Sequence, residues 1–172
     1  ARRQPFDVLL IIGESLRARS TGYSGYRRDT TPQQQDFFDR HAEQTFVFQR
    51  FYSNSTTTSE SVPSLTTGVA PDESRQRVHR MPLAFEYAKM HPGTRSFLLS
   101  TQAYDVANYR FFFQSPELDR LWYQEISGHP LFNGAGMDDH FVTAQFADEL
   151  QTLPQDERFF GMVHLFATHY PY

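Results

Sequence analysis

The chain has 172 residues, a net charge of −4 and no cysteine. Hydrophobic residues make up 39% of it and aromatic residues 16%, which is enough for one core and argues against disorder. The acidic balance, without a basic run, argues against nucleic acid as a partner. No apolar stretch approaches the roughly 20 residues that span a bilayer. Ala1, Arg2 and Arg3 lead straight into the first apolar segment, and no signal peptide is visible in these residues.

Residues 6–13 form a near-continuous apolar run, which predicts a central parallel strand buried on both faces. Glu14 follows directly, so its carboxylate would lie at the carboxyl edge of the sheet, where open α/β folds bind ligands. The alternative is that Glu14 caps a helix or pairs with Arg17 or Arg19. The segment therefore gives a first candidate for a site residue.

Two further elements are predicted before the next polar segment. Pro32 opens a helix that runs to about Ala42, with Phe37 and Phe38 pointing inward. Residues 46–52 are rich in aromatic and β-branched side chains and alternate in polarity at first, so they predict a strand.

A run of hydroxyl side chains over 53–64 follows that strand. Pro63 and Gly68 bound a short predicted helix, which begins at Ser61 or Pro63 and ends at Thr67. A hydroxyl between a strand and a helix N-terminus lies where backbone N–H groups and the helix dipole favour an oxyanion or a phosphate. The run is therefore a candidate nucleophile segment, and the alternative is a Ser/Thr-rich N-cap.

The rest of the chain alternates between helices and strands. Asp138 and Asp139 precede an apolar pattern with i, i+4 spacing, so we interpret them as helix caps and not as metal ligands. The alternation predicts an α/β fold with a mainly parallel sheet and helices on both faces, in a single domain over 1–172. The later predicted elements are a helix over 82–90, a strand over 94–100, a loop over 128–136, a helix from Asp138 and a strand over 159–166.

Three histidines in this half differ in their surroundings. His164 lies inside the apolar run, so we interpret it as a packed, hydrogen-bonded core residue and not as a ligand. His169 lies just past the end of that strand, in the segment 167–171, and is a site candidate. His129 lies in the predicted loop and is an outside candidate for substrate contact.

Three segments together resemble a known family. Residues 13–18 (GESLRA), 25–32 (GYRRDTTP) and 55–63 (STTTSESVP) match, in order and spacing, the catalytic domain of the phosphoethanolamine transferases. These are sulfatase-like members of the alkaline phosphatase superfamily. The resemblance implies an alkaline phosphatase/sulfatase-like fold that is incomplete at the C-terminus of this sequence.

The resemblance also implies roles for three residues. Glu14 corresponds to a zinc ligand, and Thr58, five residues before Pro63, corresponds to the nucleophile, which also contacts the metal. His169 corresponds to a histidine that contacts the phospho-substrate. We therefore expect one edge of the sheet to hold all three, with the Glu14 carboxylate and the Thr58 hydroxyl within roughly 5 Å of each other.

The family's Asp-His metal pair and a further substrate-binding histidine come from segments downstream of this sequence. A tetrahedral zinc site needs about four ligands, and this chain offers two. We therefore expect residues 1–172 to be the N-terminal portion of a larger catalytic domain that binds one or two divalent metals. Alone, they should be inactive and bind zinc weakly. The chain also lacks cysteine and has one lysine, Lys89, which departs from the family and leaves the substrate open.

The implied function is a zinc-dependent phosphoethanolamine-type transferase in which Thr58 attacks a phospholipid donor and a lipid or glycan accepts the group. Relatives carry upstream membrane helices, which implies membrane attachment through a segment not in this chain. The implied location is the periplasmic or extracytoplasmic face of the inner membrane. The arginines at 17, 19, 27 and 28 flank the Glu14 loop and are interpreted as a solvated face, and the alternative is a role in docking anionic groups.

Three alternatives stay open. A sulfatase would use a formylglycine made from Ser61, although position 65 is Leu where the sulfatase motif has Arg. A phosphodiester hydrolase of the same superfamily would use water in place of the acceptor. A degenerate, non-catalytic binding domain would keep only the fold.

Overall fold

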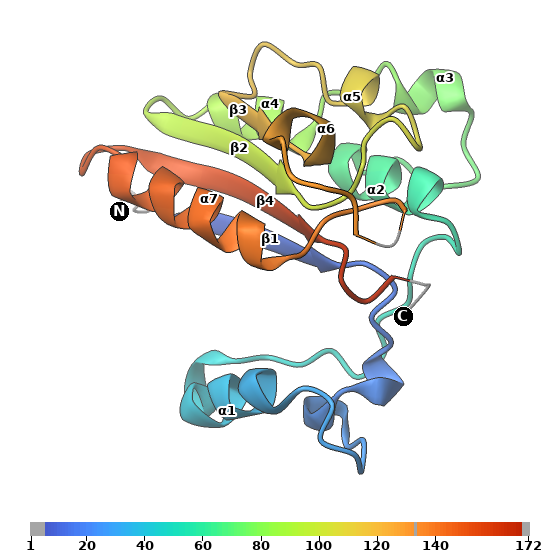
Figure 1. The fold of residues 1–172 in the computed structure, drawn as a ribbon. Coiled ribbons are helices and arrows are strands. Elements are labelled where there is room, and N and C mark those ends of the chain that lie inside the picture. Colours follow the sequence, from blue (N-terminus) through green and yellow to red (C-terminus); the bar gives the residue numbers. More distant parts are fainter. Residues whose placement is uncertain (1–5, 133, 170–172) are drawn as a thin grey trace. The chain divides into compact units, whose positions relative to one another are not determined.

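The computed structural model describes residues 6–132 and 134–169. Ala1 to Arg3, and Tyr170 and Pro171 of the segment after the last strand, lie outside the described residues. The chain forms two compact units: Ser15–Ser53 is the smaller, and the larger joins the residues up to Glu14 with those from Asn54 onward (Figure 1). None of the helices in the described part of the chain has the length and apolar character needed to cross a membrane.

A four-stranded, all-parallel sheet forms the centre of the larger unit. Helices lie on both of its faces (Figure 1), so the α/β fold class is confirmed. In the sheet, the strands follow the order β1 (Val8–Gly13), β4 (Arg158–Leu165), β2 (Thr94–Ser100) and β3 (Arg120–Trp122). The helices are α2 (Thr58–Thr67), α3 (Arg75–Val78), α4 (Ala84–Lys89), α5 (Tyr109–Phe112), α6 (Gln124–Ser127) and α7 (His140–Thr152).

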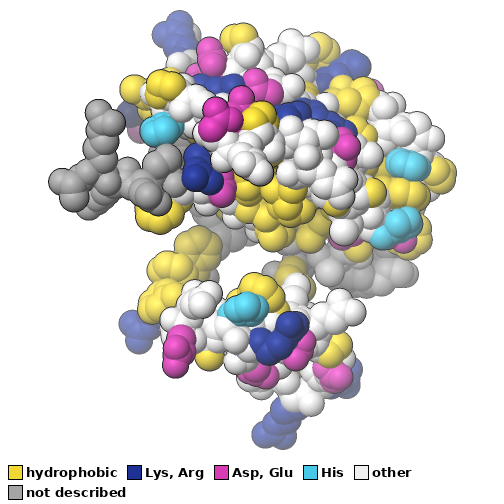
Figure 2. Space-filling model, turned by 90° about the vertical axis from the view of Figure 1, so that its left-hand side faces the viewer, with side chains coloured by type: hydrophobic (Ala, Val, Ile, Leu, Met, Phe, Trp, Pro, Cys, Tyr) yellow, Lys and Arg dark blue, Asp and Glu magenta, His cyan; other side chains and the backbone are white. Residues whose placement is uncertain are grey.

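At the end of the sheet where the strands begin, charged side chains form ion pairs. Arg95, near the start of β2, and Arg120, at the start of β3, both pair with the buried carboxylate of Glu149 on α7. Figure 2 views the molecule from this end, and basic and acidic side chains lie interspersed over the larger unit. This end of the sheet is therefore held to α7 by charge pairs.

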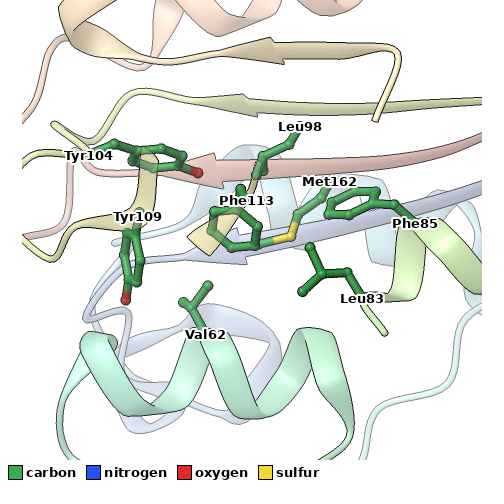
Figure 3. Close-up of a cluster of buried hydrophobic side chains, with 8 residues drawn as sticks. All are labelled: Val62, Leu83, Phe85, Leu98, Tyr104, Tyr109, Phe113 and Met162. Carbon is green, nitrogen blue, oxygen red and sulfur yellow. The ribbon is translucent and has the colours of Figure 1, made fainter. Parts of the chain in front are cut away.

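Alternation along the strands divides the apolar side chains into two clusters. Leu98 and Met162 face α2, α4 and α5, where Val62, Phe85 and Tyr109 pack with them (Figure 3). The second cluster lies on the face covered by α7, and its buried members are Phe97, Leu99, Trp122, Met137, Val142 and Val163. The position of a residue along its strand therefore decides which helices it meets.

The first strand differs from its prediction in one respect. It pairs in parallel with β4, as expected, but it lies at the edge of the described sheet, and β4 lies inside. Val8 and Ile11 are 44% and 58% exposed, so the prediction of a central strand buried on both faces is wrong for this chain. The apolar run identifies a strand, whereas the strand's place in the sheet depends on pairing partners elsewhere in the chain.

The predicted strand over 46–52 is also wrong. The structure describes all seven of these residues and shows irregular backbone there. Phe46, Phe48 and Phe51 are 68–78% exposed and pack on one another, with ring centroids 4.9 and 5.8 Å apart along the series. Strand propensity measures how well side chains pack on a pleated surface, so it does not form a strand without a partner.

The smaller unit contains α1 (Pro32–Arg40), which confirms the predicted helix. Three short 3-10 helices accompany it: η1 (Ala18–Ser20), η2 (Gly22–Ser24) and η3 (Ala42–Gln44). Phe38 packs edge-on against Tyr23 with ring centroids 4.7 Å apart, as an inward side chain does. Phe37 is 51% exposed, so the inward prediction is wrong for it.

Candidate functional site

Glu14 leaves β1 at the carboxyl edge of the sheet, as its position in the sequence predicts. Its backbone N–H donates to the Leu165 carbonyl at 2.9 Å, which extends the β1–β4 ladder by one residue beyond Gly13. Strand alternation places Glu14 on the same face as Ile12, the face on which α2 packs. The next residue, Ser15, has a left-handed backbone with φ 58°, so the chain turns directly after the carboxylate.

Helix α2 brings a hydroxyl to this edge. It begins at Thr58 and ends at Thr67, and the φ of 71° at the following residue, Gly68, suits a glycine cap. Val62 is buried in the core one turn after Thr58, which fixes the helix against the sheet. The helix starts three residues before the earliest predicted start, and Pro63 lies inside it and not in its first turn. The segment before α2 has an irregular backbone. The prediction that the hydroxyl run lies between a strand and a helix is therefore confirmed for the helix and wrong for the strand.

Thr58 and Glu14 meet at this edge. The Thr58 hydroxyl donates to Glu14 Oε1 at 2.7 Å, well within the predicted separation. The hydroxyl of the buried Tyr109 donates to the Thr58 carbonyl and so holds the first turn of α2. The expected proximity of the carboxylate and the hydroxyl is therefore confirmed.

His164 supplies the second partner of the carboxylate. It is fully buried, and its Nε2 lies 3.1 Å from Glu14 Oε2. Because an ionised carboxylate only accepts, Nε2 carries the proton and donates. The prediction of a packed, hydrogen-bonded core histidine is confirmed, but its partner was not foreseen. The contact between His164 and Glu14 follows from the β1–β4 register, which places Ile12 opposite His164. The sequence of either strand alone does not contain that register.

The surroundings keep Glu14 ionised. Burial raises the pKa of the Glu14 carboxyl, but hydrogen bonds from His164 and Thr58, with electrostatic interactions from His164 and His169, outweigh burial and leave the pKa below its usual value. A buried carboxylate that keeps its charge at neutral pH is suited to bind a cation.

His169 lies in the turn after β4, near the same carboxylate. The Thr168 hydroxyl donates to the Glu14 carbonyl, which ties this turn to the end of β1. The His169 ring stacks on Phe166, with centroids 4.6 Å apart, and its charge contributes to the low pKa of Glu14. The structure therefore brings Glu14, Thr58 and His169 to one edge of the sheet, together with His164.

His129 packs against a different element. Its ring stacks on Phe141 of α7 at 3.7 Å and meets Trp122 of β3 edge-on at 6.5 Å. Through these contacts the His129 ring packs the loop against α7. A substrate contact for His129 stays a prediction.

The donor set at this edge fits part of a metal site. A carboxylate and a hydroxyl oxygen 2.7 Å apart can both reach one zinc ion, given zinc–oxygen distances of about 2.0–2.2 Å. Across residues 6–132 and 134–169, no three His, Cys, Asp or Glu side chains come together in a metal-binding group. Glu14 and Thr58 can therefore supply two ligands of a site that needs more.

The arginines of the smaller unit lie on its surface. Arg17, Arg19, Arg27 and Arg28 are all exposed, as predicted for a solvated face. The last three line an open depression together with Tyr26. A role in docking anions stays a prediction.

Comparisons with known proteins agree with this fold. A family model described as Sulfatase matches residues 7–172. The C-terminal periplasmic domain of EptC from Escherichia coli, in complex with Zn, is 22% identical, with a TM-score of 0.75 over 98% of this chain and 45% of that one. An alkaline phosphatase superfamily protein from Vibrio parahaemolyticus is 21% identical, with a TM-score of 0.76 over 100% of this chain and 43% of that one.

A third similar structure is the soluble domain of lipooligosaccharide phosphoethanolamine transferase A from Neisseria meningitidis. It is 20% identical, with a TM-score of 0.71 over 99% of this chain and 48% of that one. The chain thus spans less than half the length of each of these structures. No curated protein sequence matches it significantly.

Proposed function

The chain belongs to the sulfatase family, and we propose that the intact protein is a metal-dependent phosphoethanolamine-type transferase with Thr58 as its nucleophile. The observation that carries this proposal is the 2.7 Å hydrogen bond between the Thr58 hydroxyl and Glu14 Oε1 at the first residue of α2. It joins a nucleophile candidate to an ionised carboxylate at a helix N-terminus.

In the proposed reaction, Thr58 Oγ1 attacks the phosphorus of a phosphoethanolamine lipid. A bond forms between Oγ1 and phosphorus, and the bond from phosphorus to the glycerol oxygen breaks. Thr58 loses its hydroxyl proton as the new bond forms, the lipid alcohol leaves with one proton in exchange, and the phosphoethanolamine group stays on Thr58. An acceptor hydroxyl or phosphate on a lipid or glycan then attacks the same phosphorus and releases Thr58. Water as the acceptor would make the protein a phosphodiester hydrolase.

The residues of the site divide this work. Glu14 Oε1 accepts the Thr58 proton in a hydrogen bond, so the oxygen lone pairs are directed away from the carboxylate. The N-terminal amides and dipole of α2 stabilise negative charge on the transferring group. His169 would bind the phosphoryl oxygens or hold the proton for the leaving alcohol.

Glu14 and Thr58 would hold the metal, which supplies a lower pKa for the Thr58 hydroxyl and stabilises charge on the transferring group when bound. The remaining ligands would come from sequence beyond residues 1–172, which we propose to be the N-terminal part of the catalytic domain. Because EptC is described as a periplasmic domain, an extracytoplasmic location is proposed for this chain as well.

Sulfate hydrolysis by a modified Ser61 is the second candidate, because the family model bears the name Sulfatase. The local geometry favours Thr58. Ser61 lies in the fourth position of α2, where its hydroxyl donates to the Thr57 carbonyl at 2.9 Å, an ordinary back-bond of a helical serine. Thr58 donates to Glu14 instead.

Alanine substitutions in the hydroxyl run test the proposal in the intact protein. Thr58→Ala should abolish transfer from a labelled phosphoethanolamine lipid, because it removes the attacking oxygen. The matched controls Thr56→Ala, Thr57→Ala and Ser61→Ala should keep transfer within about threefold. Intact-mass spectrometry should find the added phosphoethanolamine group in the wild type and not in Thr58→Ala, and fragmentation of the peptide should place it on Thr58.

Activity that survives in Thr58→Ala and is lost in Ser61→Ala, together with a formylglycine mass change at Ser61, would establish the sulfatase assignment. No turnover in the intact wild-type protein with any phosphodiester or sulfate ester would indicate a degenerate binding domain.

A further inference from the structure

We propose that Asp139 is a positioning residue, which holds the turn after β4 so that His169 lies beside Glu14 and Thr58. This inference rests on the proposed function of that site. Asp139 lies at the start of α7, far in sequence from all three residues. It touches none of the reacting groups and acts through the backbone of the turn.

The carboxylate of Asp139 binds two consecutive amides of the turn. Asp139 Oδ1 accepts from the Phe166 N–H at 2.7 Å, and Oδ2 accepts from the Ala167 N–H at 3.0 Å. Oδ1 also accepts from the Thr101 hydroxyl, which follows β2. Hydrogen bonds to an ionised acceptor are about twice as strong as neutral ones. The Asp139 carboxylate therefore links the start of α7 to the residue after β2 and to the turn after β4.

Helix capping does not account for this carboxylate. Asp139 is at the N-cap position of α7, yet its side chain makes no capping hydrogen bond. The neighbouring Asp138 accepts from the His140 N–H at 3.0 Å and so serves the start of the helix. The prediction that both aspartates are caps is thus wrong for Asp139, whose carboxylate accepts hydrogen bonds from residues outside the helix.

The bound turn fixes the His169 ring through Phe166. The Phe166 side chain is almost fully buried, and the ring of His169 stacks on it with an interplanar angle of 15°. The His169 N–H donates to the Phe166 carbonyl at 2.9 Å. Space for the Phe166 ring depends on Gly136, because a Cβ there would lie 2.2 Å from a ring atom. The position of Phe166 therefore sets the position of His169.

The test compares Asp139→Asn with Asp138→Asn in the intact protein. Each substitution removes one negative charge at adjacent positions, but only Asp139 contacts the turn. In Asp139→Asn, hydrogen exchange at the Phe166 and Ala167 amides should rise about tenfold or more. In NMR spectra of histidine-labelled protein, the ring protons of His169 should lose part of the chemical-shift change that stacking on Phe166 causes. Asp138→Asn should change neither.

Activity supplies the link to the proposed function. Asp139→Asn should lower kcat/KM about 10- to 100-fold, since small displacements of a catalytic group have effects of that size, while Asp138→Asn stays within about threefold. The proposal is overturned if Asp139→Asn leaves the exchange rates and the His169 shift unchanged. It is also overturned if exchange rises throughout the sheet, because Asp139 would then support the whole fold. If the local changes appear but wild-type transfer proves independent of Thr58, the positioning role stands and the proposed function fails.

Discussion

Two buried glutamates lie at opposite ends of the same sheet, and they are neutralised in different ways. Glu149, 1% exposed, pairs with Arg95 at 3.1 Å and with Arg120 where β2 and β3 begin. Glu14, 9% exposed, accepts hydrogen bonds from a hydroxyl and an imidazole where β1 and β4 end. The Glu149 charge is matched by guanidinium groups that are always protonated, so that carboxylate is structural. The hydrogen bonds to Glu14 come instead from a hydroxyl and an imidazole, and a buried carboxylate with such partners is suited to bind a cation.

This difference predicts opposite consequences for the same substitution. Glu14→Gln should lower the activity of the intact protein at least about 10³-fold, because it removes a charged ligand from the charge-stabilising site. Its free energy of unfolding should change by less than about 1 kcal/mol. The amide oxygen still accepts from Thr58, and a change of tautomer lets His164 accept from the amide N–H.

Turnover rates with added zinc measure the effect on activity. Urea denaturation of the same preparation measures the effect on the free energy of unfolding. A Glu14→Gln protein that keeps wild-type turnover would remove Glu14 from the catalytic site. If Glu14→Gln instead loses several kcal/mol of stability, Glu14 is a structural residue like Glu149.

Glu149→Gln should show the reverse pattern. Removing one member of a fully buried pair costs about 3–5 kcal/mol, because the partner is left without its counter-charge. Arg95 and Arg120 each keep about a quarter of the side chain exposed, so the cost here should lie at or just below the lower end of that range, at about 2–3 kcal/mol. The folded variant should keep the activity of the wild type. Asp148→Asn is the matched control, because Asp148 pairs with Arg120 but is 58% exposed, so it should cost less than about 1 kcal/mol.

Urea titrations at neutral pH compare the two variants. Equal losses for Glu149→Gln and Asp148→Asn would show that burial does not strengthen this pair, and the contrast with Glu14 would lose its basis.

The sequence predicts local elements better than their pairing. The apolar run over 159–166 predicts β4, because a strand buried on both faces needs continuous apolar side chains. The strand predicted over 94–100 is β2, with the same bounds. β3 was not predicted, since its three residues are too few to show a pattern. The segment 46–52 has strand composition but irregular backbone, because pairing depends on a partner that the segment does not contain.

The same limit applies to the site. Glu14 and Thr58 were predicted from motif order, and their contact was anticipated because both follow ends of elements at one edge. For His164 the sequence predicts only a core position, and for Asp139 only a helix cap. Their contacts are to residues 150 positions and 27–38 positions away, so register and loop docking decide them.

The smallest expected effect tests whether a second carboxylate at the Glu149 end is also held by a fixed cation. Asp119 Oδ2 lies 2.5 Å from Lys89 Nζ and accepts from the Ser96 N–H at 2.7 Å. Burial raises the pKa of Asp119, but the hydrogen bonds from Lys89 and from the Ser96 amide outweigh it and leave the pKa below its usual value. A carboxyl with a lowered folded-state pKa stabilises the fold above its unfolded-state pKa, and this contribution is lost as the pH falls through the folded-state value.

The stability difference between wild type and Asp119→Asn should therefore be complete at pH 6 and shrink steadily below about pH 4. It should be small throughout, because 37% of the Asp119 side chain is exposed. Urea midpoints of the two proteins from pH 6 to pH 3 measure it, with Lys89→Met as the control that removes the cation and leaves the Ser96 amide. Lys89→Met should reproduce part of the loss. A difference that stays constant down to pH 3 would mean that the carboxylate charge contributes nothing, and only Glu149 would then represent a charge-paired carboxylate at that end of the sheet.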